Sequence, residues 1–119
     1  MGMEDALERA RAYVNAGADG IMIHSRKKDP KEIFEFCDLF RKTDSETPIV
    51  VVPTTYSETY ESELVEHGVN VVIYANQLTR SAFPAMENVA KKILKNHRAK
   101  EAEEQLISIN QILTLIDTL

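Results

Sequence analysis

Polar side chains follow three short apolar runs in this sequence, and they are the residues best suited to chemistry. They are His24 and Ser25 after the first run, Thr54, Thr55 and Tyr56 after the second, and Asn76 and Gln77 after the third. Imidazole, hydroxyl and amide groups can donate hydrogen bonds to a carboxylate or phosphoryl oxygen. If the three runs are parallel strands, their carboxyl ends meet at one edge of the sheet, where parallel α/β folds build their sites.

His24 is the sharpest of these candidates. Its imidazole can donate to an anionic oxygen or move a proton near neutral pH, whereas the alternative is a histidine that only caps a loop. Ser25 and Asn76 can donate to a substrate carboxylate or phosphoryl group, or they can satisfy the backbone of a turn. We therefore predict a substrate-binding set of His24, Ser25 and Asn76, with the turn interpretation left open.

Other polar residues favour structural roles. Arg26, Lys27 and Lys28 form a basic loop, which is either solvated or screens an acidic substrate. Cys37 lies on an apolar helical stripe and is expected in the core. The sequence has no glycine-rich phosphate loop, no Cys-x-x-Cys motif and no histidine pair at metal-ligand spacing. We expect no metal site and no catalytic residue built from this chain alone.

Three helix-then-strand units must position the candidate residues. Helices are expected at Glu4–Ala16, from Asp29 to about Phe40, and at Tyr60–His67, because apolar residues recur there every three or four positions. Buried strands are expected at Ile21–Ile23, Pro48–Val52 and Val69–Ala75. Gly17 and Gly68 each follow a helix and suit its C-terminal stop. Such alternation predicts an α/β fold with parallel strands covered by helices.

Local signals mark the ends of the helices. Asp29 and Glu32 are spaced as a capping box for the second helix, with Pro30 at its first position. A fourth helix is predicted at Ser81–Lys95 with Pro84 in its first turns, and a fifth at Ile109–Leu119 after a Ser108–Gln111 capping box. The interpretation divides the chain into two parts. Residues 1–97 form part of a barrel, and residues 98–119 form a connector and a C-terminal helix that two subunits can exchange.

Composition excludes several classes of protein. The chain has 119 residues, a net charge of -5 and a hydrophobic fraction of 44%. The negative charge disfavours a nucleic-acid partner, and no apolar run reaches the roughly 20 residues of a membrane helix. The single cysteine allows no internal disulfide and fits a reducing cytoplasm.

The number of strands poses a problem of size. A complete eight-stranded barrel takes about 250 residues, and an isolated three-stranded parallel sheet leaves two edges unpaired. We therefore expect a partial (β/α)8 TIM-type barrel of three parallel strands with C-terminal helices, which forms a homo-oligomer. A small free-standing three-layer sandwich is the alternative.

Several segments, in this order, resemble the phosphoenolpyruvate mutase family of the isocitrate lyase superfamily. They are Gly17–Ser25, Lys28–Pro30, Val50–Tyr56, Gly68–Asn76 and Ile107–Leu113. The resemblance implies that the chain is the C-terminal part of such a barrel. It also implies a small anionic substrate, Mg²⁺ in the intact enzyme, and interconversion of phosphoenolpyruvate and phosphonopyruvate in phosphonate biosynthesis. The histidine that matches His24 lines the family's substrate pocket near the transferred phosphoryl group.

Two departures from the family pattern limit what the resemblance implies. The family's metal-binding aspartates, gating loop and substrate arginine lie in its first five strands, and this sequence has no counterpart for them. Gln77 also stands where the family usually has histidine. We therefore expect the chain to be inactive alone. A phosphonopyruvate hydrolase or related lyase fragment, and a non-catalytic self-assembling half-barrel, remain the alternatives.

Overall fold

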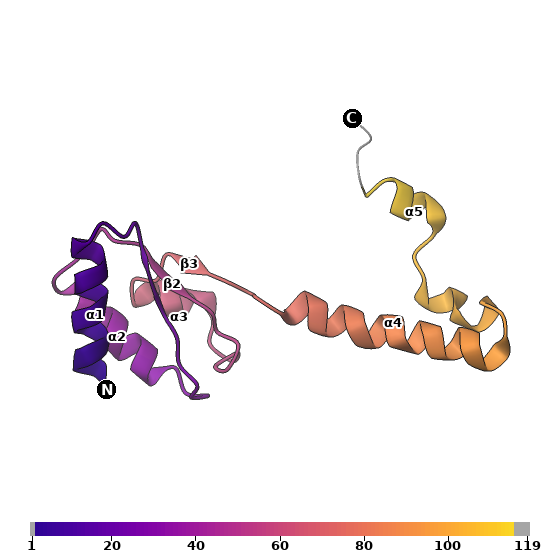
Figure 1. Ribbon diagram of the computed structural model, residues 1–119, viewed down its shortest axis with the longest axis horizontal. Coiled ribbons are helices and arrows are strands. Elements are labelled where there is room, and N and C mark those ends of the chain that lie inside the picture. The colour runs from indigo at the N-terminus through magenta and orange to yellow at the C-terminus, as the bar shows by residue number, and fades with distance from the viewer. Residues whose placement is uncertain (1, 116–119) are drawn as a thin grey trace. The chain divides into compact units, whose positions relative to one another are not determined.

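A computed structural model describes residues 2–115 of the chain (Figure 1). The chain divides into two compact units between Ala75 and Asn76. The sequence-based division into 1–97 and 98–119 stays a prediction.

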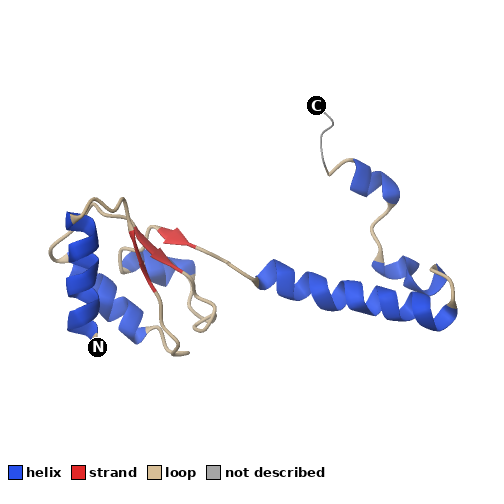
Figure 2. Cartoon of the chain, in the orientation of Figure 1, coloured by secondary structure: helices blue, strands red, loops and turns tan. Residues whose placement is uncertain are grey.

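The first unit alternates helices and strands as expected (Figure 2). Its elements are α1 (Met3–Asn15), β1 (Ile21–Ile23), α2 (Lys31–Arg41), β2 (Ile49–Val51), α3 (Glu61–Glu66) and β3 (Val71–Val72). The strands form one sheet in the order β1-β2-β3. Both pairs are parallel, with Ile21 opposite Ile49 and Val51 opposite Val72. The predicted α/β class with three parallel strands is therefore confirmed.

The strands at the second and third positions are shorter than predicted. β2 covers Ile49–Val51 instead of Pro48–Val52, and β3 covers Val71–Val72 instead of Val69–Ala75. Pro53 follows β2 and has no N–H to donate, which limits how far the ladder can continue. Within residues 2–115, β3 pairs only with β2, so the ladder on β3 ends where β2 ends.

Helices cover one face of this sheet. The predicted stripe on α2 is buried, with Phe40 and Cys37 both 0% exposed. It packs with Ile21 of β1 and with Ile49 and Val51 of β2 in a single apolar cluster, to which α1 and α3 also contribute. Successive side chains of a strand point to opposite faces. Ile21, Ile49 and Val51 therefore all point toward the helices.

The alternate residues of the strands form a second sheet face that the first unit leaves largely open. Met22, Val50 and Val71 lie side by side in the register. Met22 is 60% exposed and Val71 44% exposed. In a closed barrel such a face is the packed interior.

Two glycines end helices in the same way, as the internal repeat predicted. Gly17 (φ 97°) and Gly68 (φ 81°) both adopt left-handed backbone angles. After α1, Ala18 N–H donates to the Tyr13 carbonyl and Gly17 N–H to Val14; after α3, Val69 and Gly68 repeat the pattern. Both are Schellman motifs, which satisfy carbonyls that the helix leaves unpaired.

The predicted capping box at the start of α2 is wrong. Asp29 Oδ1 does accept from the Lys31 N–H at 2.9 Å, but α2 begins at Lys31, with Pro30 as its N-cap residue. Glu32 therefore lies too early in the helix to reach back to Asp29. Its carboxylate instead contacts Ser25 and Lys27.

The second unit contains α4 (Gln77–Asn96), the 3₁₀ helix η1 (Lys100–Gln105) and α5 (Ile109–Leu113). α4 begins one turn earlier than the predicted Ser81, so Pro84 lies inside the helix and not in its first turns. Proline there removes one backbone hydrogen bond. The Ser108–Gln111 capping box of α5 is confirmed. The predicted helix Ile109–Leu119 is too long, because α5 ends at Leu113 and Thr114 is its C-cap residue, and the predicted part at 116–119 lies outside the described residues.

Candidate functional site

The carboxyl ends of the three parallel strands place His24, the Pro53–Tyr56 segment and Ile73–Tyr74 along one edge of the first unit. The chain changes from apolar to polar side chains after β1 and β2, whereas Ile73 and Tyr74 follow β3. The predicted gathering of polar groups there is therefore present for the segments that follow β1 and β2.

His24 is exposed to solvent. It lines a groove of about 410 Å³ along the free edge of β1, together with Arg9 and Tyr13 of α1. It also borders a smaller hollow of about 250 Å³, to which Glu32 contributes. An exposed imidazole between two such hollows can reach a ligand, which a histidine buried among apolar neighbours cannot.

Ser25 is 3% exposed, and its polar groups are engaged within the protein. Its hydroxyl donates to the Glu32 carboxylate and accepts from the Lys27 N–H at 3.0 Å. Because a serine hydroxyl has one proton, Ser25 has no donor left for a substrate in this arrangement. Its predicted role in binding stays a prediction, and its structural role is the one that the geometry supports.

Thr55 joins the end of β2 to the end of β1. Its Oγ1 donates to the Ser25 carbonyl at 2.7 Å. The two residues are 30 positions apart, so no local sequence pattern predicts this contact. The neighbouring Tyr56 is 1% exposed and belongs to the core. Burial raises the pKa of its phenol to about 12, so Tyr56 stays neutral and serves packing.

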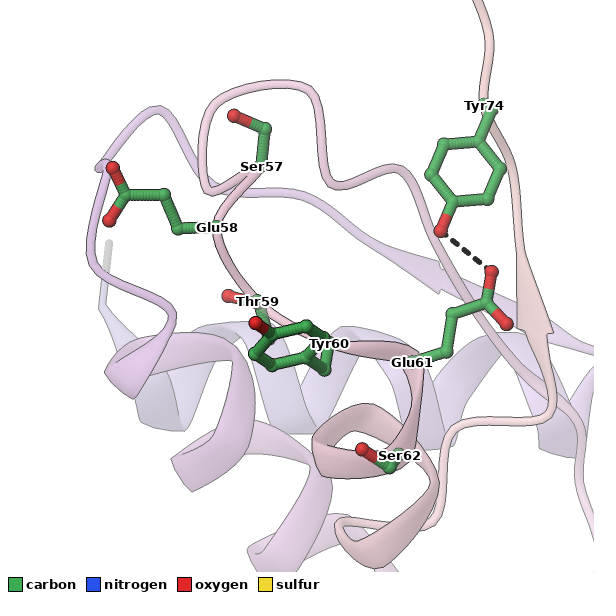
Figure 3. A pocket seen from close by; sticks show the side chains of 7 residues that line it. All are labelled: Ser57, Glu58, Thr59, Tyr60, Glu61, Ser62 and Tyr74. Carbon is green, nitrogen blue, oxygen red and sulfur yellow. Dashed lines mark hydrogen bonds between the residues drawn. The ribbon is translucent and has the colours of Figure 1, made fainter.

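A hydroxyl-rich hollow of about 830 Å³ lies beside the end of β3. Figure 3 shows the residues that line it, namely Ser57, Glu58, Thr59, Tyr60, Glu61, Ser62 and Tyr74. Tyr74 donates its hydroxyl proton to Glu61 at 2.7 Å, which raises the pKa of Tyr74. No local sequence pattern links Glu61, the first residue of α3, with Tyr74, which follows β3.

The third predicted binding residue belongs to the second unit. Asn76 is the N-cap residue of α4, and its side chain makes no capping hydrogen bond. Its Oδ1 lies 3.5 Å from Arg80 Nη1, and its N–H donates to Gln77 Oε1 at 3.1 Å. Asn76, Gln77 and Arg80 thus form a local polar group at the start of α4, and the binding role of Asn76 stays a prediction.

The remaining ionisable candidates have structural surroundings. Arg26, Lys27 and Lys28 are all exposed, and Lys27 Nζ lies 2.5 Å from Glu32. His67 is the C-cap residue of α3, where its Nδ1 lies 2.7 Å from Asp38 Oδ1 and its ring stacks on Phe34. Burial raises the pKa of Cys37 to about 11, so this thiol is neutral and unreactive near pH 7.

The described residues hold no ready metal site and no membrane span. Among residues 2–115, no three His, Cys, Asp or Glu side chains lie together in a way that could bind a metal ion. The Mg²⁺ that the resemblance implies therefore has no ligand set in this part of the chain. None of the described helices has the length and apolar character needed to cross a bilayer.

Comparison with known proteins places this arrangement in a wider group. Residues 1–94 match the sequence model of the family described as phosphoenolpyruvate phosphomutase. The phosphoenolpyruvate phosphomutase of Streptomyces viridochromogenes is 39% identical over 115 residues, which are 97% of this chain and 36% of that protein. The phosphonopyruvate hydrolase of Variovorax sp. is 35% identical over 116 residues, 97% of this chain and 39% of the relative.

Solved structures agree with the sequence comparisons. The crystal structure of the phosphoenolpyruvate phosphomutase of Streptomyces platensis subsp. rosaceus superposes with a TM-score of 0.87 at 32% identity. The match covers 96% of this chain and 39% of that one. The chain thus spans between a third and two fifths of the length of the curated relatives it matches.

Proposed function

Because this chain belongs to the phosphoenolpyruvate phosphomutase family, we propose that it is part of an enzyme that interconverts phosphoenolpyruvate and phosphonopyruvate. The observation that carries the proposal is the exposed His24 at the carboxyl end of β1, in a chain that matches mutases over nearly its whole length. The phosphoryl group bears negative charge while it is transferred, so a hydrogen-bond donor fixed beside it stabilises the transition state.

The proposal assigns different roles to the candidate residues. His24 donates to the phosphoryl group, and Asn76 keeps its predicted role as a substrate-binding residue. Ser25 acts through its backbone position and its hydrogen bonds. Mg²⁺ is held by segments of the enzyme that this chain does not contain, since the described residues do not fit it. The proposed location is the cytoplasm, where the buried free thiol Cys37 stays reduced.

We expect the purified chain to leave phosphonopyruvate unchanged in the presence of Mg²⁺. The reason is that no carboxylate cluster in the described residues can hold the metal beside His24. ³¹P NMR distinguishes the phosphonate of the substrate from the phosphate ester of phosphoenolpyruvate and from free phosphate. Circular dichroism of the same sample establishes that the chain is folded, and the Streptomyces viridochromogenes enzyme serves as the active control.

Turnover by this chain alone would contradict the proposed division of roles. Appearance of phosphoenolpyruvate would indicate a mutase site complete within the chain, and appearance of free phosphate would indicate a hydrolase. The hydrolase is the second candidate function, because the Variovorax relative is 35% identical over 116 residues.

We also propose that the chain self-associates. In the described residues β1 and β3 each have one unpaired edge, and apolar side chains such as Phe83 (66%) and Leu94 (73%) of α4 are exposed. Burying such surface is favourable by about 25 cal/mol per Å². We expect sedimentation equilibrium at micromolar concentration to give at least a dimer, and Phe83→Glu to shift the distribution toward monomer. Glu87→Lys, a charge change on the same helix, is the matched control.

A chain that sediments as a monomer at high concentration would contradict the self-association proposal. A stable oligomer without ligand binding would instead favour the third interpretation, a non-catalytic half-barrel that acts only by assembly.

A further inference from the structure

Ser25 is clamped from two sides by residues of other elements. Glu32, in the first turn of α2, accepts the hydrogen bond from the Ser25 hydroxyl. Thr55, which follows β2, donates its own hydroxyl to the Ser25 carbonyl at 2.7 Å. The side chain and the backbone of one residue that is 3% exposed are thus held at the same time.

These two contacts, the Ser25 clamp, hold the residue that directly follows His24. A peptide unit is planar, so only two soft dihedral angles per residue separate the fixed Ser25 from the His24 side chain. On the other side, His24 is preceded by Ile23, the last residue of β1, which pairs with Val51 of β2. The backbone of His24 therefore lies between a strand and a clamped residue, although its imidazole is exposed.

We propose that Glu32 and Thr55 are positioning residues, which fix the turn after β1 and thereby hold the His24 imidazole at the carboxyl edge of the sheet. This inference rests on the proposed function, because the proposed reaction is what gives the position of the His24 imidazole a role. In this proposal each of the two residues acts through its contact with Ser25.

The charge of Glu32 suits this role. Hydrogen bonds from Lys27 and Ser25 lower the pKa of Glu32, so the group remains a carboxylate near neutral pH. An ionised carboxylate only accepts hydrogen bonds, which obliges the Ser25 hydroxyl to be the donor. The Lys27 side chain is 68% exposed, and an ion pair so open to water contributes little. The bond to Ser25 is therefore the contact that matters.

Two pairs of variants separate the hydrogen bonds from general stability. Thr55→Val keeps the shape of the side chain and removes the hydroxyl, while Thr55→Ser keeps the hydroxyl. Glu32→Ala removes the acceptor, while Glu32→Gln keeps one amide oxygen that can accept from Ser25. Glu35→Ala, an exposed carboxylate one turn along α2, is the matched control for loss of charge.

The first readout is the order of the turn, from ¹⁵N relaxation of residues 24–27 in the full chain. We expect wild-type order parameters near 0.85, and values below about 0.6 in Thr55→Val and Glu32→Ala. Thr55→Ser, Glu32→Gln and Glu35→Ala are expected to stay near wild type. Amide signals of α2 and β2 that keep their positions establish that each variant is folded. A turn that remains rigid in both Thr55→Val and Glu32→Ala would overturn the inference.

The second readout is the response of His24 itself to inorganic phosphate, followed by the imidazole Hε1 signal, which His24→Asn identifies. We expect a saturable shift in the wild type and an apparent affinity about tenfold weaker in the two disruptive variants, because a mobile imidazole must be ordered when phosphate binds. Saturable shifts of equal affinity in the wild type and the variants would overturn the positioning role. No response in the wild type, combined with loss of order in the variants, would count against the proposed function and leave the clamp supported.

Discussion

Replacing His24 by alanine is expected to lower kcat/KM about 100-fold in an enzyme that carries this chain as its matched segment. Removing one donor to a developing negative charge typically costs 10²- to 10³-fold in rate. The measurement needs a chimera, in which this chain replaces the 115 matched residues of the Streptomyces viridochromogenes phosphomutase. Conversion of phosphonopyruvate to phosphoenolpyruvate is followed by ³¹P NMR.

The chimera allows a control within the same protein. His67 contacts Asp38 and Phe34 beside the helices and does not lie at the carboxyl edge of the sheet. His67→Ala is therefore expected to change kcat/KM by less than about twofold at a temperature where both variants are folded. If His24→Ala has no larger effect than His67→Ala, His24 does not serve the reaction. A chimera that receives only residues 17–77 repeats the test if the longer exchange does not fold.

Replacing Arg41 by alanine is expected to lower the free energy of unfolding of the first unit by about 3 kcal/mol. The Arg41 guanidinium donates to the Gly68 carbonyl at 3.1 and 2.7 Å, and to the carbonyls of Asp44 and Thr47 at 3.1 and 2.9 Å. It also donates to Asn70 Oδ1 at 2.7 Å. A net hydrogen bond to a charged group contributes about 1.5–3 kcal/mol, and several of these depend on one side chain.

Tyrosine fluorescence during urea unfolding measures this effect on the first unit, since the four tyrosines of the sequence all lie before residue 76. Arg41→Lys is expected to recover only part of the loss, because an ammonium group cannot reproduce the planar fork of guanidinium donors. Arg9→Ala is the matched control. Its exposed pair with Asp5 should contribute less than about 1 kcal/mol. Equal losses for Arg9→Ala and Arg41→Ala would show that the Arg41 contacts do not stabilise the fold.

The elements of the fold followed from the sequence because they depend on neighbours along the chain. The stripe through Ile33, Phe36 and Phe40 predicted α2 and its buried face, since residues three and four apart share one side of a helix. Gly17 and Gly68 predicted helix stops, since glycine readily adopts the left-handed backbone angles that those stops require. The parallel arrangement followed from the alternation of helices with apolar strands.

Errors arose where a distant residue decides the outcome. Spacing alone assigned Glu32 to a capping box with Asp29, whereas its partner is Ser25, across the turn after β1. The predicted length of β3 was wrong because β2, the strand with which it pairs, ends at Val51. Gly68 has one feature that the sequence predicts and one that depends on a distant residue. Its φ of 81° was foreseeable, but its close approach to Arg41, where an added Cβ would lie 2.8 Å from Nε, was not.

The amino-acid sequence by itself determined the helices of the first unit, the parallel strands and the family, and it singled out His24 as a candidate. Only the tertiary structure decided what surrounds that histidine: the Glu32 and Thr55 contacts to Ser25, and the open sheet face beside it. Periodicity and capping reflect interactions within a few residues, which a sequence displays directly. Contacts such as that of Thr55 with Ser25 join residues 30 positions apart, and they exist only once strand register has brought those residues together.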